Sequence, residues 1–244
     1  MDINSIARGI SIWAMPVLLA IILHEVMHGY VAEKFGDSTA RRAGRLTLNP
    51  IKHIDPIGTV VLPLILLILN APIIGWAKPV PVNFAALRKP KRDMVWVAIA
   101  GPGTNFALAA VSALILRVIV MLEPGVLAIT DMNLAPEVLR THGMAISFLV
   151  PIVLMLNASI AINSFLMLLN MIPVPPLDGG RVLVGLLPPR AAYSYSKIER
   201  FGIIIIFLLI FLPQTQILFI RVASIFIYFF GNMAGTLSIM RGIL

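Results

Sequence analysis

Long runs of apolar side chains constrain the fold of this chain more than any other feature. A helix needs about 20 mostly apolar residues to cross the roughly 30 Å hydrocarbon core of a bilayer. Hydrophobic residues make up 59% of the 244 positions and charged residues only 12%, which is more apolar material than a soluble core requires. We therefore predict an all-α polytopic membrane protein with about six membrane segments. These apolar segments lie at about 6–32, 56–76, 94–122, 144–171, 201–212 and 217–237.

The basic residues lie almost entirely between the apolar runs. They give a net charge of +8, which in a soluble protein could indicate nucleic-acid binding. Here their placement indicates topology signals and contacts with anionic lipid, so no nucleic-acid partner is expected. The chain has no cysteine, which excludes disulfides, iron–sulfur clusters and thiolate zinc sites. The first apolar run follows Arg8 without a small-residue cleavage pattern after it, so we expect an uncleaved helix.

The charge of the loops predicts a topology. Loops 33–53, 77–92 and 178–200 are basic, whereas 123–143 is mainly acidic. The positive-inside rule places the basic loops in the cytoplasm and 123–143 outside. Segment 56–76 would then enter the membrane and return, and its prolines suit such a re-entrant element. The alternative is that this segment spans and one basic loop departs from the rule.

The stretch GWAKPVPVNF, residues 75–84, is short and extended in character. Pro79 and Pro81 cannot donate to a β-ladder, so a strand here would be an edge strand. Such an edge could pair with an unwound substrate by strand addition. The alternative is an ordinary loop stiffened by proline.

The motif HEVMH lies inside the first apolar run. His24 and His28 are four residues apart, so a helix places both imidazoles on one face, where they can bind one ion. Glu25 can reach a water on that ion, which is the arrangement of zinc hydrolases. An ionisable residue at the bilayer centre costs about 3 kcal/mol, and metal binding is one reason for placing three together. The alternative for the trio is a proton or ion pathway in a transporter.

A catalytic zinc ion needs a third protein ligand. Asp178 is the best candidate, because prolines end the helix before it and two glycines free the backbone after it. His53 and Asp55 lie in a polar loop before segment 56–76, and His142 lies in the acidic loop. These three residues stay as alternatives, and PPLDGG can also be a plain turn.

Three motifs in order, HEVMH, GPGTN at 101–105 and NMIPVPPLDG at 170–179, resemble the site-2 protease family of intramembrane zinc metalloproteases. The resemblance implies His24, His28 and Asp178 as ligands of one Zn²⁺, and Glu25 as the catalytic base. It is to the compact form of the family, without an appended peptide-binding or nucleotide-sensing domain. We therefore expect one membrane-embedded metalloprotease domain over 1–244. Its core segments are about 6–32, 94–122 and 144–182, and its accessory segments about 56–76, 201–212 and 217–237.

Two asparagines complete the candidate site. By resemblance, Asn170 helps to bind the substrate carbonyl, and an amide donor of this kind can stabilise an oxyanion. Its alternative role is to cap the helix end. Asn105 lies on a face of small residues suited to close helix packing, so it either hydrogen-bonds the substrate or holds helices together.

The expected activity is hydrolysis of peptide bonds within or near transmembrane segments, with zinc-activated water and a Glu general base. The resemblance implies single-span membrane proteins as substrates. We expect a multi-pass protein of the cell membrane, most simply the cytoplasmic membrane of a prokaryote. A metal or proton transporter is the alternative function, but it predicts pseudo-symmetric halves and no internal repeat is evident. An inactive scaffold would be expected to lack Glu25. The sequence does not indicate an oligomeric state.

Overall fold

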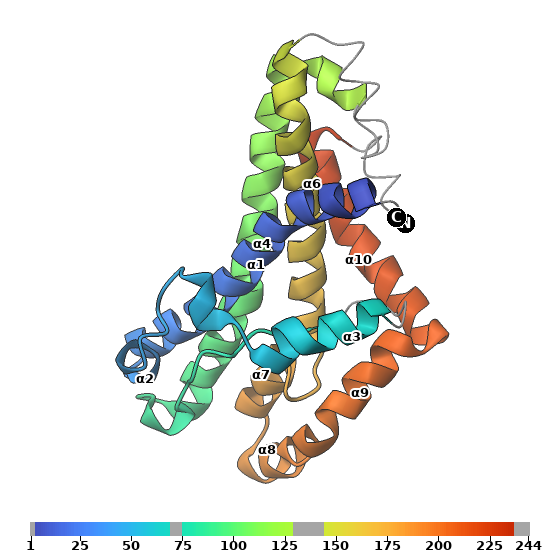
Figure 1. Cartoon of the computed structure of the whole chain (residues 1–244). Helices are drawn as coiled ribbons and strands as arrows, with labels where there is room; N and C mark the ends of the chain where they lie inside the picture. The colour runs from blue at the N-terminus through green and yellow to red at the C-terminus, as the bar shows by residue number, and fades with distance from the viewer. Residues whose placement is uncertain (1–2, 69–74, 129–143, 237–244) are drawn as a thin grey trace. The chain divides into compact units, whose positions relative to one another are not determined.

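A computed structural model of the chain describes residues 3–68, 75–128 and 144–236, and these are helical, with no strand among them (Figure 1). The α-helices are α1 (Ile3–Lys34), α2 (Thr39–Arg42), α3 (Leu62–Ile68), α4 (Pro90–Leu122), α6 (Met144–Met171), α7 (Asp178–Leu186), α8 (Pro189–Ser196), α9 (Glu199–Phe211) and α10 (Pro213–Ala234). Short 3₁₀ or π turns are η1 (Pro50–His53), η2 (Pro56–Val61), η3 (Phe84–Ala86) and η4 (Pro124–Ala128).

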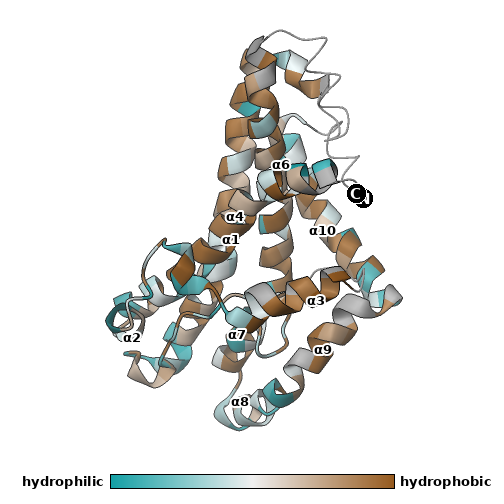
Figure 2. Cartoon of the chain, viewed as in Figure 1, coloured by the Kyte–Doolittle hydropathy of each residue, from teal (hydrophilic) through white to brown (hydrophobic). Residues whose placement is uncertain are grey.

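Among the residues that the structure describes, four helices are long and apolar enough to cross a membrane. Their hydrophobic character is visible along α1, α4, α6 and α10 in Figure 2. The predicted all-α polytopic fold is therefore confirmed. The stretches are Ala7–Lys34, Pro90–Leu122, Phe148–Met171 and Gln214–Ala234.

The other two predicted segments form shorter helices in the described part of the chain. Segment 56–76 begins as η2 and α3, and its residues 69–74 lie outside the described ranges. Whether this segment spans or re-enters the membrane therefore stays a prediction. Segment 201–212 corresponds to α9, which has 13 residues and begins in its polar lead-in at Glu199. At 1.5 Å per residue α9 is about 20 Å long, less than the roughly 30 Å of a full span.

Proline and glycine set several helix boundaries. Pro213 occupies the first turn of α10, where a missing N–H costs nothing. Gly235 ends α10 in the left-handed conformation, with φ of 75°. Pro16, Pro102 and Pro151 lie inside α1, α4 and α6, which membrane helices tolerate better than soluble ones.

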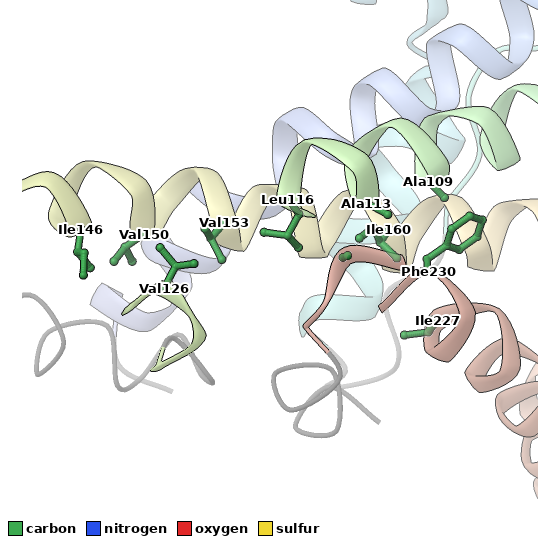
Figure 3. Packing of buried hydrophobic residues seen from close by; sticks show 11 residues of the cluster. Ala109, Ala113, Leu116, Val126, Ile146, Val150, Val153, Ile160, Ile227 and Phe230 are labelled. Atoms are coloured by element: carbon green, nitrogen blue, oxygen red, sulfur yellow. The ribbon is translucent and has the colours of Figure 1, made fainter. Parts of the chain in front are cut away.

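The chain divides into two compact units, each with its own packing. The first unit contains residues 1–20, 105–170 and 200–244. Within it the later part of α4 and α6 run side by side (Figure 1), and α10 adds Ile227 and Phe230 to their shared core (Figure 3). Small residues such as Ala109 and Ala113 on α4 let the helices approach closely, as is typical of membrane helix packing.

The second unit contains residues 21–104 and 171–199. Its buried apolar cluster joins Ala32 of α1 with Leu87 and Val97. The unit holds the later part of α1, α2, α3, the start of α4, α7 and α8. All residues of the HEVMH motif and Asp178 belong to it, so the second unit contains the predicted metal ligands.

Residues 75–83 of the second unit form a loop rather than a strand. Of the two structures predicted for this stretch, an edge strand or a loop stiffened by proline, the structure has the loop. Its backbone is nevertheless well anchored: Trp76 donates to the Gly58 carbonyl over 3.1 Å, and Lys78 donates to the His53 carbonyl over 2.9 Å.

Candidate metal centre

Helix α1 brings the two histidines of HEVMH together. His24 and His28 are one helical turn apart, and their Nε2 atoms are 3.1 Å from each other. Their rings meet edge to face, with centroids 4.7 Å apart. Both residues are buried, so two imidazole nitrogens lie close together among apolar side chains.

The third candidate ligand, Asp178, follows the turn between α6 and α7. α6 ends at Met171, a proline-rich turn follows, and Asp178 is the first residue of α7. A side chain at Gly179 would lie 2.6 Å from the Ile172 carbonyl oxygen, so glycine lets this turn fold back closely on α7. Asp178 Oδ2 thereby lies 3.2 Å from Nε2 of His24 and 3.2 Å from Nε2 of His28.

These three atoms fit a metal ion. Zinc binds nitrogen and oxygen ligands at about 2.0–2.2 Å, so neighbouring ligands of a tetrahedral ion are roughly 3.3 Å apart. The observed separations are 3.1, 3.2 and 3.2 Å. Asp178 Oδ2 is buried and accepts no hydrogen bond from the described residues. A buried carboxylate oxygen without a donor is costly unless a cation balances it. His24, His28 and Asp178 can therefore hold a metal ion together.

Helix α4 supports the rings from behind. His28 Nδ1 is 2.7 Å from the Val97 carbonyl oxygen, which can only accept, so Nδ1 carries the proton and Nε2 presents its lone pair. Metal-binding histidines commonly make such a second hydrogen bond. Gly101, one turn further along α4, leaves room for both rings. A Cβ at that position would lie 2.6 Å from Cε1 and Nε2 of His24.

Glu25 lies next to His24 and is only partly buried. One of its carboxylate oxygens, Oε2, accepts a hydrogen bond of 2.7 Å from the backbone N–H of Val80. The other carboxylate oxygen, Oε1, does not take part in this hydrogen bond. A carboxylate offers about four lone-pair positions, so it can accept from a second donor while this bond persists.

The other candidate ligands have different partners. His53 is buried, and its Nε2 is 2.8 Å from the Thr47 carbonyl oxygen. Asp55 caps η2, because its Oδ1 accepts from the backbone N–H groups of Ile57 and Gly58. His142 lies outside the described residues. Neither His53 nor Asp55 joins the three-residue group found in the described part of the chain.

The two asparagines belong to the first unit. Asn170, at the end of α6, donates from Nδ2 to the Leu166 carbonyl over 3.0 Å. Asn105 is fully buried, and its Nδ2 is 3.2 Å from the Ala20 carbonyl and 2.8 Å from Asn163 Oδ1. The structure thus gives both predicted asparagines hydrogen-bond partners within the protein.

Sequence reasoning missed the supports of this site. Val97 and Val80 contribute only backbone atoms, so the amino-acid type at these positions does not reveal their role. Gly101 was visible in GPGTN, but as part of a small-residue packing face rather than as the space for two imidazoles. In the first unit, the Asn105 partner Asn163 was also missed, because it lies in no motif; an asparagine within an otherwise apolar run was the available signal.

Comparison with known protein families shows the family to which this chain belongs. The model of Peptidase family M50 matches residues 12–213, which cover α1 to the start of α10. The chain therefore belongs to peptidase family M50, the site-2 protease family, as its three motifs predicted.

Curated relatives agree with this assignment. The chain is 36% identical over 199 residues to "Putative zinc metalloprotease YwhC" of Bacillus subtilis, covering 81% of this chain and 78% of that protein. It is 25% identical over 225 residues to "Putative zinc metalloprotease Rip2" of Mycolicibacterium smegmatis, covering 91% and 73%. The Rip2 protein of Mycobacterium tuberculosis strain H37Rv is 27% identical over 204 residues, covering 82% and 66%. No solved structure gives a significant match. The protein is thus a zinc metalloprotease with several membrane helices.

Proposed function

We propose that this protein hydrolyses peptide bonds within or near transmembrane segments of other membrane proteins, with His24, His28 and Asp178 as the zinc ligands. The observation that carries the proposal is that three buried ligand atoms, from His24, His28 and Asp178, lie 3.1–3.2 Å apart, with Glu25 directly after His24 on α1. When bound, zinc supplies Lewis acidity that polarises a carbonyl and lowers the pKa of water towards neutrality.

Glu25 is the proposed general base. It lies one residue after His24 on α1, and the Val80 N–H holds one carboxylate oxygen while the other can take a proton from the attacking water. Glu25 would then pass that proton to the leaving amide nitrogen. The same group serves as base and acid in turn, so no further titratable residue is needed.

Asn170 is the proposed donor to the substrate carbonyl oxygen. Its Nδ2 donates to the Leu166 carbonyl in the structure, so it would turn from its own helix to the substrate. A single donor placed where negative charge develops contributes on the order of 100- to 1000-fold in rate.

The substrates are proposed to be single-span membrane proteins whose helix unwinds locally. A helical peptide bond is hydrogen-bonded to its neighbours, so an extended segment is needed for attack. We propose that residues 1–244 act as one membrane-embedded protease domain, and that the protein works in the cytoplasmic membrane of a prokaryote.

The direct test compares two carboxylates on the same helix. Purified Glu25→Gln protein with zinc and a model transmembrane substrate should lose cleavage by at least about 1000-fold, because the amide cannot accept the proton. Glu33→Gln is the matched control. Glu33 also lies on α1, but it pairs with Arg41 and should leave cleavage unchanged. Retained cleavage by Glu25→Gln would sink the proposed role of Glu25.

A further inference from the structure

Residues 76–83 reach the catalytic helix through one backbone amide. Pro79 and Pro81 carry no N–H, so Val80 supplies the only backbone donor in the PVP triplet. That N–H lies 2.7 Å from Glu25 Oε2, although the two residues are 55 positions apart in the chain. Val80 itself is buried, whereas Glu25 is only partly buried.

The direction of the Val80 N–H is fixed by its neighbours. The amides of Trp76 and Lys78 donate to the carbonyls of Gly58 and His53, so alternate residues bond on the same side. The carbonyl oxygen of Lys78 accepts from the Arg45 guanidinium over 2.6 Å. Two residues before Val80, the backbone is therefore held at both its N–H and its C=O.

The loop is also secured beyond and beside Val80. The Asn83 N–H donates to Asp37 Oδ2 over 2.6 Å. On α1, Gly29 lies one turn after Glu25, and a Cβ there would come within 2.8 Å of Val80 Cγ1. The glycine thus lets the Val80 side chain rest directly against the helix, beside the carboxylate that its N–H contacts.

We propose that Val80 is a positioning residue for catalysis, whose backbone N–H holds the Glu25 carboxylate in its reactive orientation. The inference rests on the proposed role of Glu25 as general base. A glutamate side chain has three rotatable bonds, and a fixed partner removes that freedom before the reaction begins. Oε2 is bound to the loop, which leaves Oε1 for the proton.

Hydrogen–deuterium exchange tests the contact without relying on activity. A peptide that covers residues 79–81 reports one backbone amide there, that of Val80. Glu25→Ala should make this amide exchange at least about tenfold faster, because its acceptor is lost, whereas the Trp76 and Lys78 amides stay slow. Glu25→Gln should keep it slow, because the side-chain amide oxygen still accepts. Equal exchange of the Val80 amide in wild type and Glu25→Ala would overturn the proposal.

Kinetics test the consequence. Val80→Pro removes the backbone N–H at a position that already has proline on both sides, Pro79 and Pro81. It should lower kcat by about 10- to 100-fold, with KM and the zinc content per chain unchanged. Val80→Ala keeps the backbone N–H, so its kcat should fall markedly less than that of Val80→Pro. If both variants lose kcat equally, the N–H has no positioning role.

The outcomes separate this inference from the proposed function. If Glu25→Gln is inactive and Val80→Pro keeps the wild-type kcat, only the positioning role fails. If Glu25→Gln still cleaves, the proposed function fails whatever Val80 does. If Val80→Pro does not fold, the exchange comparison of Glu25→Ala with Glu25→Gln decides alone.

Discussion

Each compact unit buries polar side chains among apolar helices, but the two groups are built differently. In the first unit, Asn105 donates to Asn163 Oδ1 and to the Ala20 carbonyl. In the second unit, His24 and His28 approach Asp178 to 3.2 Å, yet Asp178 Oδ2 accepts no hydrogen bond from the described residues. Burial does not distinguish the groups, because all five residues are at most 9% exposed.

The difference is in the pairing of donors and acceptors. An amide carries both, so two asparagines can satisfy each other and join helices. The Nε2 lone pair of His28 and the buried Asp178 Oδ2 are both acceptors 3.2 Å apart, so their approach is unfavourable without a cation. Unmatched convergence, rather than burial of polar groups, therefore identifies the functional centre in this protein.

Removal of the carboxylate should have the largest effect. Asp178→Ala removes one of three proposed ligands, so the zinc content should fall from about one ion per chain to nearly none, and cleavage should be lost. Metal analysis of the purified protein checks this. Asp93→Ala is the matched control: Asp93 is also a buried carboxylate of the second unit, but it accepts from the Lys89 N–H at the start of α4. An unchanged zinc content in Asp178→Ala would contradict the ligand assignment.

The next largest effect should come from the space behind the imidazoles. Gly101→Ala places a methyl group 2.6 Å from atoms of His24, so the rings must move and zinc affinity should fall at least about tenfold. Gly103→Ala lies in the same GPG sequence and meets nothing within 4 Å, so it should bind zinc like the wild type. Competition with a chromophoric chelator measures both. Equal affinities for the two variants would show that the imidazoles do not depend on this helix contact.

The asparagine pair should affect stability rather than metal binding. Asn105→Ala and Asn163→Ala should each destabilise the fold by about 1 kcal/mol, because side-chain hydrogen bonds between membrane helices contribute roughly 0.6–1.7 kcal/mol. The double variant should cost less than the sum, because both changes break one bond. Unfolding in mixed micelles measures this. Loss of cleavage without loss of stability in Asn105→Ala would instead support its role in substrate binding.

The smallest effect concerns pH and lies outside the membrane helices. Burial alone raises the pKa of Asp37, but hydrogen bonds from Thr39 and from the Asn83 N–H outweigh it and hold that pKa below its usual value. A lowered pKa in the folded state adds stability above the unfolded pKa of about 3.9, and this is lost as pH falls through the folded pKa. Asp37→Asn should therefore lose stability at neutral pH and lose less on acidification. An identical pH profile to wild type would contradict this.

The sequence predicted the long helices well because their signal is local. The apolar runs 6–32, 94–122 and 144–171 correspond to α1, α4 and α6. The structure extends α1 to Lys34 and starts α4 at Pro90, beyond the apolar residues, because polar residues also continue or cap a helix. Segment 56–76 was less predictable, since a run with several prolines fits more than one backbone path.

The site was predictable where side chains carry the chemistry. The spacing of His24 and His28 fixes their shared face, and the broken helix before Asp178 made that residue the best third candidate. The Val97 carbonyl and the Val80 N–H were not predictable, because every residue other than proline has both groups. Only the path of the chain in space selects which ones meet the site.

X-ray absorption at the zinc edge of the purified protein tests the central claim most directly, that one ion is held by two histidines and one aspartate. The spectrum should show nitrogen and oxygen neighbours at about 2.0–2.1 Å, with the outer-shell scattering of two imidazoles. His28→Ala, which like Asp178→Ala removes one of the three proposed ligands, should abolish this signal because little zinc stays bound. A spectrum without imidazole scattering, or one unchanged in His28→Ala, would contradict the account.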